Sequence, residues 1–250
     1  VESNRLAVYT HAGNLLAGFP VAVGTDTIVS SPALADLIGD PLREIVVIGR
    51  DQAGLHTLYI YNGDGSLRGS SALPSGETTY YDPVARLRPG LTQDEILVAT
   101  VSGKILRFRY DSAGTLEQTQ VADVARPAAV TAEPRQGGGG EVWVSFPQVA
   151  ELKVYTVDRV NPVNPWTLDR TLTVASPIIH GMVFGDYTAR TNNDGGVYGV
   201  NAAGQFVGLA TSTGALLGGY PVTLAAAPLS GPVLADANTA NPGAEFVIPL

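Results

Sequence analysis

Short apolar runs alternate with polar turns along the whole chain, and their order repeats about every fifty residues. In the clearest unit, apolar runs occupy residues 30–36, 44–48 and 58–61, and a tight turn follows at 62–65. Runs of this length, rich in β-branched and aromatic residues and bounded by Gly, Asn and Asp, predict strands. With a further strand after the turn, each unit is expected to form a four-stranded antiparallel sheet.

The unit returns four more times, and each copy begins near a proline. The landmark prolines are Pro32, Pro83, Pro127, Pro177 and Pro232. The last copy stops after its second run, at 245–248, and the missing half lies at the other end of the chain. Residues 5–10 match a third strand, and residues 15–21 match the fourth strand at 215–222. The two chain ends are therefore expected to build one sheet together.

Repeats of this length and strand content predict a β-propeller, in which sheets bury their faces against one another around an axis. We expect a five-bladed, all-β propeller of four-stranded antiparallel blades, with the last blade shared between the termini. Sharing that blade pairs backbone groups that would otherwise form open edges. The predicted domain is a single one, 1–250. Its blades are expected at 28–75, 78–124, 125–175, 176–227, and 228–250 with 1–26.

One strand of the second unit, residues 105–110, alternates clearly. Leu106, Phe108 and Tyr110 fall on one face and are expected to be buried, while Arg107 and Arg109 fall on the other. The two arginines are interpreted as a solvated stripe on the outside of the blade.

Composition removes several classes of function. The net charge is −8 without a basic run, which argues against nucleic acid as a partner. No apolar stretch is long enough for a membrane-spanning helix, so no membrane insertion is expected. Cysteine is absent, which excludes disulfides and thiolate chemistry. The chain begins at Val1, as expected of a mature or excised piece.

The run 30–36, the strand 44–47, the turn 62–65 and the Gly-Phe-Pro-Val exit at 18–21 together resemble FG-GAP/VCBS-like repeats. Propellers of that family occur in bacterial secreted and cell-surface proteins, among them adhesins, toxin components and appendages of extracellular enzymes. The resemblance implies an extracellular or cell-surface location. It also implies calcium as the candidate cofactor, since the loop after the first strand of such repeats often holds that ion.

Two loops keep part of the calcium pattern that the resemblance implies. The first has Asp36, Asp40 and Glu44, and the last has Asp236, Asn238 and Glu245. Carboxylate and amide oxygens at alternate positions suit a hard cation with six to eight ligands. The alternative is that these side chains only cap turns through their own backbone. No cofactor is required for folding in either case. In the second unit, Arg86 and Arg88 would repel a cation from the loop.

Catalytic patterns are missing from the chain. It has no nucleophile elbow, zinc-binding helix motif or phosphate loop. His11, His56 and His180 are far apart in sequence and are interpreted as turn or packing residues. Asp82 is the acid that begins a predicted inner strand, and one acid does not make the carboxylate pair of a glycosidase. We therefore expect no enzymatic activity.

A sugar-binding site would need an aromatic platform, and the aromatics do not repeat from unit to unit. They are interpreted as core and strand residues: Trp143, Trp166, Tyr80, Tyr81, Tyr187 and Tyr198. The expected function is a non-catalytic extracellular module for binding, adhesion or structural interaction. Its partner would be a protein or glycan on a cell surface or within a larger extracellular assembly. The alternatives are a carbohydrate-binding lectin and a propeller-type glycoside hydrolase or lyase.

Overall fold

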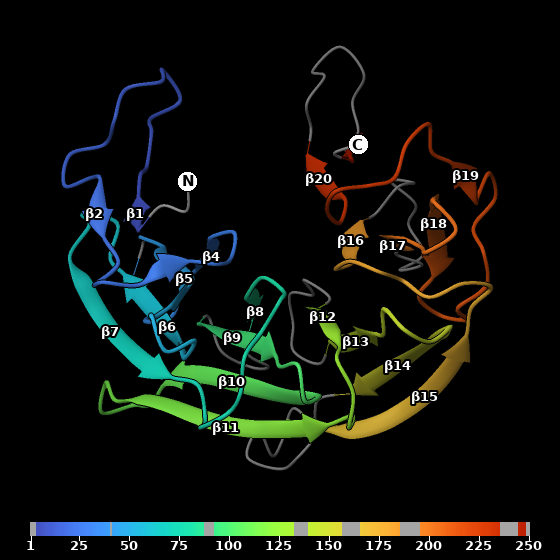
Figure 1. Cartoon of the computed structure of the whole chain (residues 1–250), viewed down its shortest axis with the longest axis horizontal. Helices are drawn as coiled ribbons and strands as arrows, with labels where there is room; N and C mark the ends of the chain where they lie inside the picture. Colours follow the sequence, from blue (N-terminus) through green and yellow to red (C-terminus); the bar gives the residue numbers. More distant parts are fainter. Residues whose placement is uncertain are drawn as a thin grey trace. The chain divides into compact units, whose positions relative to one another are not determined.

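The computed structural model describes residues 4–40, 42–87, 93–132, 140–156, 166–185, 196–235 and 245–248. All regular elements in these ranges are strands, and they form antiparallel sheets (Figure 1). The chain divides into two compact units. The first, unit 1, is built mainly from Val1–Arg126, and the second, unit 2, mainly from residues 127–250.

Unit 1 contains two complete blades and one hairpin. The first blade is formed by β4 (Ala33–Ala35), β5 (Glu44–Arg50), β6 (His56–Tyr61) and β7 (Leu67–Ala72), with β3 (Thr27–Ile28) pairing the far end of β5. The second blade is formed by β8 (Val84–Leu87), β9 (Asp94–Ala99), β10 (Lys104–Tyr110) and β11 (Leu116–Asp123). The hairpin consists of β1 (Arg5–Leu6) and β2 (Val21–Ala22).

Unit 2 also contains two complete blades and one hairpin. The third blade is formed by β12 (Ala129–Ala132), β13 (Glu141–Ser145), β14 (Glu151–Thr156) and β15 (Thr167–Thr173). The fourth is formed by β16 (Val183–Gly185), β17 (Gly196–Val200), β18 (Gln205–Ala210) and β19 (Val222–Thr223). The hairpin consists of β20 (Val233–Ala235) and β21 (Glu245–Val247).

The two hairpins correspond to opposite halves of a blade. In β1–β2, Leu6 lies opposite Val21, as Phe206 lies opposite Val222 in β18–β19, so β1 and β2 have the arrangement of third and fourth strands. The isolated bridge Tyr9–Leu15 likewise matches the bridge Leu209–Leu216. The hairpin β20–β21 instead matches β4–β5: the pairs Val233–Val247 and Ala235–Glu245 stand where Ala33–Val46 and Ala35–Glu44 stand. Each half is a two-stranded sheet.

The second strand of a blade is apolar on both faces because both faces are covered. Every residue of β5 from Glu44 to Gly49 is buried. Val46 and Ile48 pack toward the second blade, in a cluster with Ile96 and Phe108. Ile45 and Val47 pack on the other side against the N-terminal hairpin. Burying each large side chain contributes about 1.5–3 kcal/mol, so these continuous apolar runs are the main source of stability.

The same arrangement holds in unit 2. Trp143, Leu152 and Val154 of the third blade pack against Val207 and Leu209 of the fourth, and all five side chains are buried. Trp143 also meets Phe184 edge to face, with ring centroids 6.2 Å apart. On the other side of the fourth blade, Phe246 of β21 packs on Tyr198, with ring centroids 4.3 Å apart.

Two expectations about strands were wrong. The fourth copy was expected to begin with a strand at its landmark proline, Pro177, but the first strand of the fourth blade is β16, and Ile178 makes only an isolated bridge to Asn201. Val183 pairs with Tyr198 of the second strand, as Ala33 pairs with Val46 in the first blade. Val183 therefore corresponds to Ala33, and the residue before it, Met182, takes the position of Pro32. The local pattern of Pro177 and two isoleucines imitates a first strand, but the hydrogen-bond register with β17 selects the later segment.

The solvated arginine stripe on β10 was also wrong for Arg107. Leu106, Phe108 and Tyr110 are buried as expected, but Arg107 is only 2 % exposed. Arg109 is mostly covered as well, and its Nε donates to Glu117 Oε2 at 2.9 Å. A strand with one polar face normally predicts solvent on that face. In this blade the second face is covered too, so its arginines must find partners inside the protein.

Candidate functional site

The first predicted calcium loop lies between β4 and β5. Asp36 Oδ1 accepts a hydrogen bond from Gly39 N at 2.6 Å, and Asp40 Oδ1 accepts one from Leu42 N at 2.7 Å. Glu44 Oε2 accepts a third from Leu37 N at 2.7 Å. Each acidic side chain thus binds an amide within its own loop, which is how Asp and Asn stabilise turns.

Asp94, which the sequence analysis did not single out, joins this loop from the second blade. Its Oδ2 accepts a hydrogen bond from Asp36 N at 2.8 Å and lies 3.4 Å from Arg43 Nη1. Burial raises the pKa of Asp94, and the pKa of Glu44 is raised by burial as well. The only sequence signal for Asp94 was an acid at the start of a second strand. Its contact with Asp36 depends on blade packing, which sequence spacing does not reveal.

The described part of this loop does not gather ligands as a calcium centre would. Calcium needs six to eight converging oxygens. Among the described residues, no group of three or more His, Asp or Glu side chains is placed to hold a metal ion. In the second predicted loop, Asp236 and Asn238 lie outside the described residues, and so does the side chain of Glu245.

Glu95 of the second blade corresponds to Glu44 of the first, but the two acids have different hydrogen-bond donors. Glu44 accepts from a backbone amide, whereas Glu95 accepts from an arginine side chain. Arg86 lies opposite Glu95 across β8–β9, as Ala35 lies opposite Glu44 across β4–β5. Arg86 Nη1 donates to Glu95 Oε1 at 2.6 Å, and both side chains are buried. The guanidinium of Arg86 therefore balances the buried charge of Glu95 inside the blade.

The histidines occupy three different settings. His56 is buried at the start of β6, and its Nδ1 accepts a hydrogen bond from Thr79 N at 3.2 Å. Burial first, and then the charge of Arg50, lower the pKa of His56. His180 Nε2 lies 3.4 Å from Pro228 O, and His11 is exposed in a turn. His56 thus fastens the connector between the first two blades.

Asp82, the acid at the start of an inner strand, has a structural contact. Its Oδ1 accepts a hydrogen bond from Ser31 N at 2.6 Å. Ser31 immediately precedes Pro32 and β4, and Asp82 precedes Pro83 and β8. The carboxylate therefore links the beginnings of the first and second blades.

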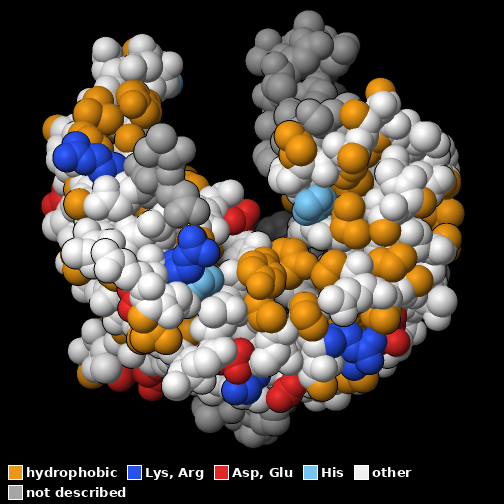
Figure 2. Space-filling model, viewed as in Figure 1, with side chains coloured by type: hydrophobic (Ala, Val, Ile, Leu, Met, Phe, Trp, Pro, Cys, Tyr) orange, Lys and Arg blue, Asp and Glu red, His pale blue; other side chains and the backbone are white. Residues whose placement is uncertain are grey.

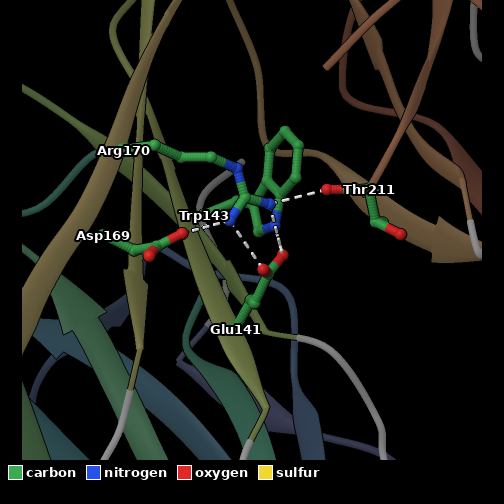
Figure 3. Close-up of polar contacts among 5 residues, drawn as sticks. All are labelled: Glu141, Trp143, Asp169, Arg170 and Thr211. Atoms are coloured by element: carbon green, nitrogen blue, oxygen red, sulfur yellow. Dashed lines mark hydrogen bonds and ion pairs between the residues drawn. The ribbon is translucent and has the colours of Figure 1, made fainter. Parts of the chain in front are cut away.

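In unit 2 a cluster of polar contacts surrounds Arg170 on β15 (Figure 3). Its Nη1 lies 2.8 Å from Glu141 Oε1 and also contacts Asp169, while its Nη2 donates to Thr211 O at 2.6 Å. Burial opposes the charge of Arg170, but the hydrogen bonds to Glu141 and Asp169 outweigh it and raise the pKa of Arg170. The guanidinium also stacks on Trp143, 5.6 Å from the ring centroid.

This cluster joins the third blade to the fourth, because Thr211 follows β18 whereas the other members come from β13 and β15. Trp143 is fully buried, and its Nε1 donates to Glu141 Oε2 at 2.9 Å. Trp166 packs on Tyr155 and Tyr198 is buried, so the expectation of core and strand aromatics is confirmed for Trp143, Trp166 and Tyr198. It was wrong for Tyr80, which is 77 % exposed and lies outside the strands. Tyr187 lies outside the described residues.

Large apolar side chains are exposed on the connectors between blades. Tyr80, between β7 and β8, is 77 % exposed, and Leu229, between β19 and β20, is 74 % exposed. Each stands three residues before a landmark proline, Pro83 or Pro232. Leu55, in the turn before β6, is also exposed. It is next in sequence to His56, whose carbonyl accepts a hydrogen bond from Leu73 N at the start of the connector to the second blade. Figure 2 shows further apolar side chains over β12 and β16 of unit 2.

No described helix is both long and apolar enough to cross a membrane. No family model matches the chain. A search of curated proteins found no match either.

The structure itself is similar to solved propellers. Two crystal structures of BBS1N in complex with ARL6DN, soaked with lead and with mercury, superpose with TM-scores of 0.52 and 0.53. The sequence identities are 14 % and 12 %, and each match covers 99 % of this chain and 80 % of the other. Identity at this level shows the fold alone. The chain is an all-β propeller with four-stranded antiparallel blades.

Proposed function

We propose that the chain is a single domain, 1–250, and a five-bladed propeller whose fifth blade is assembled from β20–β21 and β1–β2. The complementary registers of the two half blades support this. In the first blade Val46 lies opposite Ile60, and in the fourth Tyr198 lies opposite Gly208. The same register applied to the half blades places Val247 opposite Val8.

Exposure of apolar residues supports the same closure. Tyr9, the counterpart of Leu209, is 63 % exposed, whereas Leu209 is 4 % exposed because it packs on the third blade. Leu34 on the innermost strand of the first blade is 57 % exposed, while Ala35 beside it is buried. Apolar surface of this kind is stabilised by burial against a neighbouring blade.

We propose that this propeller is a non-catalytic module that binds another protein. The observation that carries the proposal is the likeness to BBS1N, whose solved structures are complexes with ARL6DN. Exposed apolar side chains of the kind enriched at protein interfaces lie on unit 1, at Leu55 and Tyr80, and separately on unit 2, at Leu229.

The resemblance to FG-GAP/VCBS-like repeats supports an extracellular or cell-surface location in a bacterium, and adhesion as the setting of that interaction. A glycan is the alternative partner. A propeller hydrolase or lyase is the less favoured alternative, because the described carboxylates Asp82, Asp36 and Glu44 each accept a backbone amide hydrogen bond.

The experiment compares wild-type chain with the double variant Tyr80→Ser/Leu229→Ser in cross-linking and affinity capture from the cell envelope and secreted fraction. Leu67→Ser on β7 is the matched control, since Leu67 is 54 % exposed but lies away from the connectors. Proteins captured by wild type and Leu67→Ser but lost in the double variant support the proposal. Equal capture by all three, or binding confined to a glycan array, contradicts it.

A further inference from the structure

Unit 2 contains a cavity of about 280 Å³ between the third and fourth blades. Its apolar wall is formed by Val174, Ile178, Val207, Leu209, Leu216 and Pro221. One corner is polar and carries the side chains of Asn201 and Gln205. The volume is just below the roughly 300–1,000 Å³ typical of ligand pockets, so it suits a small molecule.

At the corresponding junction in unit 1 the chain between the two blades is longer. Leu73 in unit 1 and Val174 in unit 2 occupy corresponding positions, just after the last strand of a blade. Leu73 N donates to His56 O, and Val174 N donates to Ala150 O, in each case within the blade that the chain is leaving. The next matching anchors are Thr78 O, which accepts a hydrogen bond from Val101 N, and Pro177 O, which accepts one from Ala202 N. Between these anchors unit 1 has residues 74–77, whereas unit 2 has only residues 175–176.

The extra connector in unit 1 brings a carboxylate into the junction. Glu77 is 6 % exposed, its Oε1 lies 2.7 Å from Lys104 Nζ, and its Oε2 accepts from Ser102 Oγ at 2.7 Å. Lys104 is the counterpart of Gln205, because both end the same kind of turn. Lys104 N donates to the side chain of Thr100, and Gln205 N donates to the side chain of Asn201. In unit 1 the side chain at this position, Lys104, therefore binds a carboxylate oxygen of Glu77, whereas in unit 2 the corresponding Gln205 faces the cavity.

Hydrogen bonds fix what this corner offers. Asn201 Oδ1 accepts from Ala203 N at 3.1 Å and from Gln205 N at 3.0 Å, so the Asn201 amide group must donate through Nδ2. That Nδ2 donates to Gln205 Oε1 at 3.1 Å. Gln205 Nε2 then makes no hydrogen bond within the described residues, and it presents donors alone.

We propose that this cavity binds a small uncharged molecule with an apolar body and one acceptor oxygen, such as a ketone, ester or amide. The oxygen accepts a hydrogen bond from Gln205 Nε2, and the apolar body fills the space beside Val207 and Leu209. A carboxylate fits less well, because none of the described residues that line the cavity is a Lys or Arg that could take the role of Lys104.

The test uses acetophenone and ethylbenzene, which have nearly the same shape but differ in the acceptor oxygen, together with benzoate as the charged acceptor. Binding is followed by backbone amide chemical shifts of the full chain. Acetophenone is expected to shift resonances of residues 174–178 and 201–209, with affinity about five-fold above that of ethylbenzene, the value of one hydrogen bond. Benzoate is expected to bind more weakly than acetophenone.

Two variants separate this site from nonspecific binding. Gln205→Glu keeps an acceptor for Asn201 Nδ2 but removes the donor, so the preference for acetophenone should disappear. Replacing residues 175–176 by Pro-Ser-Gly-Glu together with Gln205→Lys copies the connector of unit 1, and should abolish binding of every probe. If the graft does not fold, Gln205→Glu still decides. Equal affinities for acetophenone and ethylbenzene, shifts elsewhere in the chain, or a preference that survives Gln205→Glu would overturn the proposal.

Discussion

Arg86 and Glu95 form an ion pair inside unit 1, with Nη1 and Oε1 2.6 Å apart and side chains only 1 % and 3 % exposed. The two residues face each other across β8 and β9. At the matching place in the first blade, Glu44 has a backbone amide as its donor. Successive blades therefore satisfy a buried acid by different means.

Arg86→Met is expected to destabilise the protein by about 3–5 kcal/mol, because it leaves the charge of Glu95 buried without a partner. The double variant Arg86→Met/Glu95→Leu should recover most of that loss, since an apolar pair removes both charges. Urea unfolding of the wild type and both variants measures these differences. A single variant as stable as the wild type would show that the ion pair does not hold the blade.

Stability is expected to fall on mild acidification because of His56. Its pKa is lowered by burial and by Arg50, so the folded protein favours the neutral ring. The stabilising contribution is complete above the ordinary histidine pKa of 6.5 and is lost as the pH falls through the lower pKa of the folded state. His56→Asn can retain an acceptor for Thr79 N without titrating. The difference in free energy of unfolding between the wild type and this variant should therefore shrink from about pH 7.5 to about pH 5.5. A constant difference would contradict the prediction.

Calcium and chelator are both expected to leave the melting temperature unchanged. The reason is that Asp36 and Glu44 bind loop amides. Calcium should be added to about 5 mM, above the 10⁻⁴–10⁻³ M range of extracellular calcium modules. Asp36→Asn keeps the acceptor and should change stability by less than about 0.5 kcal/mol, whereas Asp36→Ala should cost about 1 kcal/mol.

A rise in melting temperature with calcium would show that an ion loop is functional. Loss of that rise in Asp36→Asn would assign it to the first loop. Its loss in Asp236→Asn instead would assign it to the last loop, which lies outside the described residues.

The proposed fifth blade can be tested with a disulfide, because the chain contains no cysteine of its own. Leu16 N donates to Val8 O, as Leu217 N donates to Gly208 O, so Val8 turns its hydrogen-bonding groups toward the fourth strand. Val8 and Val247 would then form a non-hydrogen-bonded pair with Cα atoms about 4.5 Å apart, within the range that a disulfide spans. Val8→Cys/Val247→Cys should oxidise within one chain and raise the melting temperature.

The matched control is Val8→Cys/Glu245→Cys, which is displaced by two residues and about 7–8 Å apart in the same register. It should oxidise poorly. Disulfide-linked dimers from the first variant would point to joining between chains, and no oxidation at all would refute closure of the blade. Non-reducing gels and thiol counting distinguish these outcomes.

Sequence periodicity located most strands because the second strands are buried on both faces. The residues of β5 and β9 read as continuous apolar runs, and a tight turn with Gly65 at φ 85° separates β6 from β7. Periodicity failed at Pro177, where two neighbouring segments carry similar patterns and only the pairing of β16 with β17 distinguishes them. It failed again at Arg107, because a polar residue in a strand does not reveal what covers it.

The amino-acid sequence by itself determined the strand content and the repeat, and it predicted that one unit is split between the chain ends. These follow from short-range alternation of apolar and turn residues, which the chain carries locally. Tertiary structure alone decided that Asp94 reaches the loop of Asp36, that Arg170 joins two blades, and that Gln205 faces a cavity. Such contacts join residues far apart along the chain, and their geometry is set by how one sheet packs on the next.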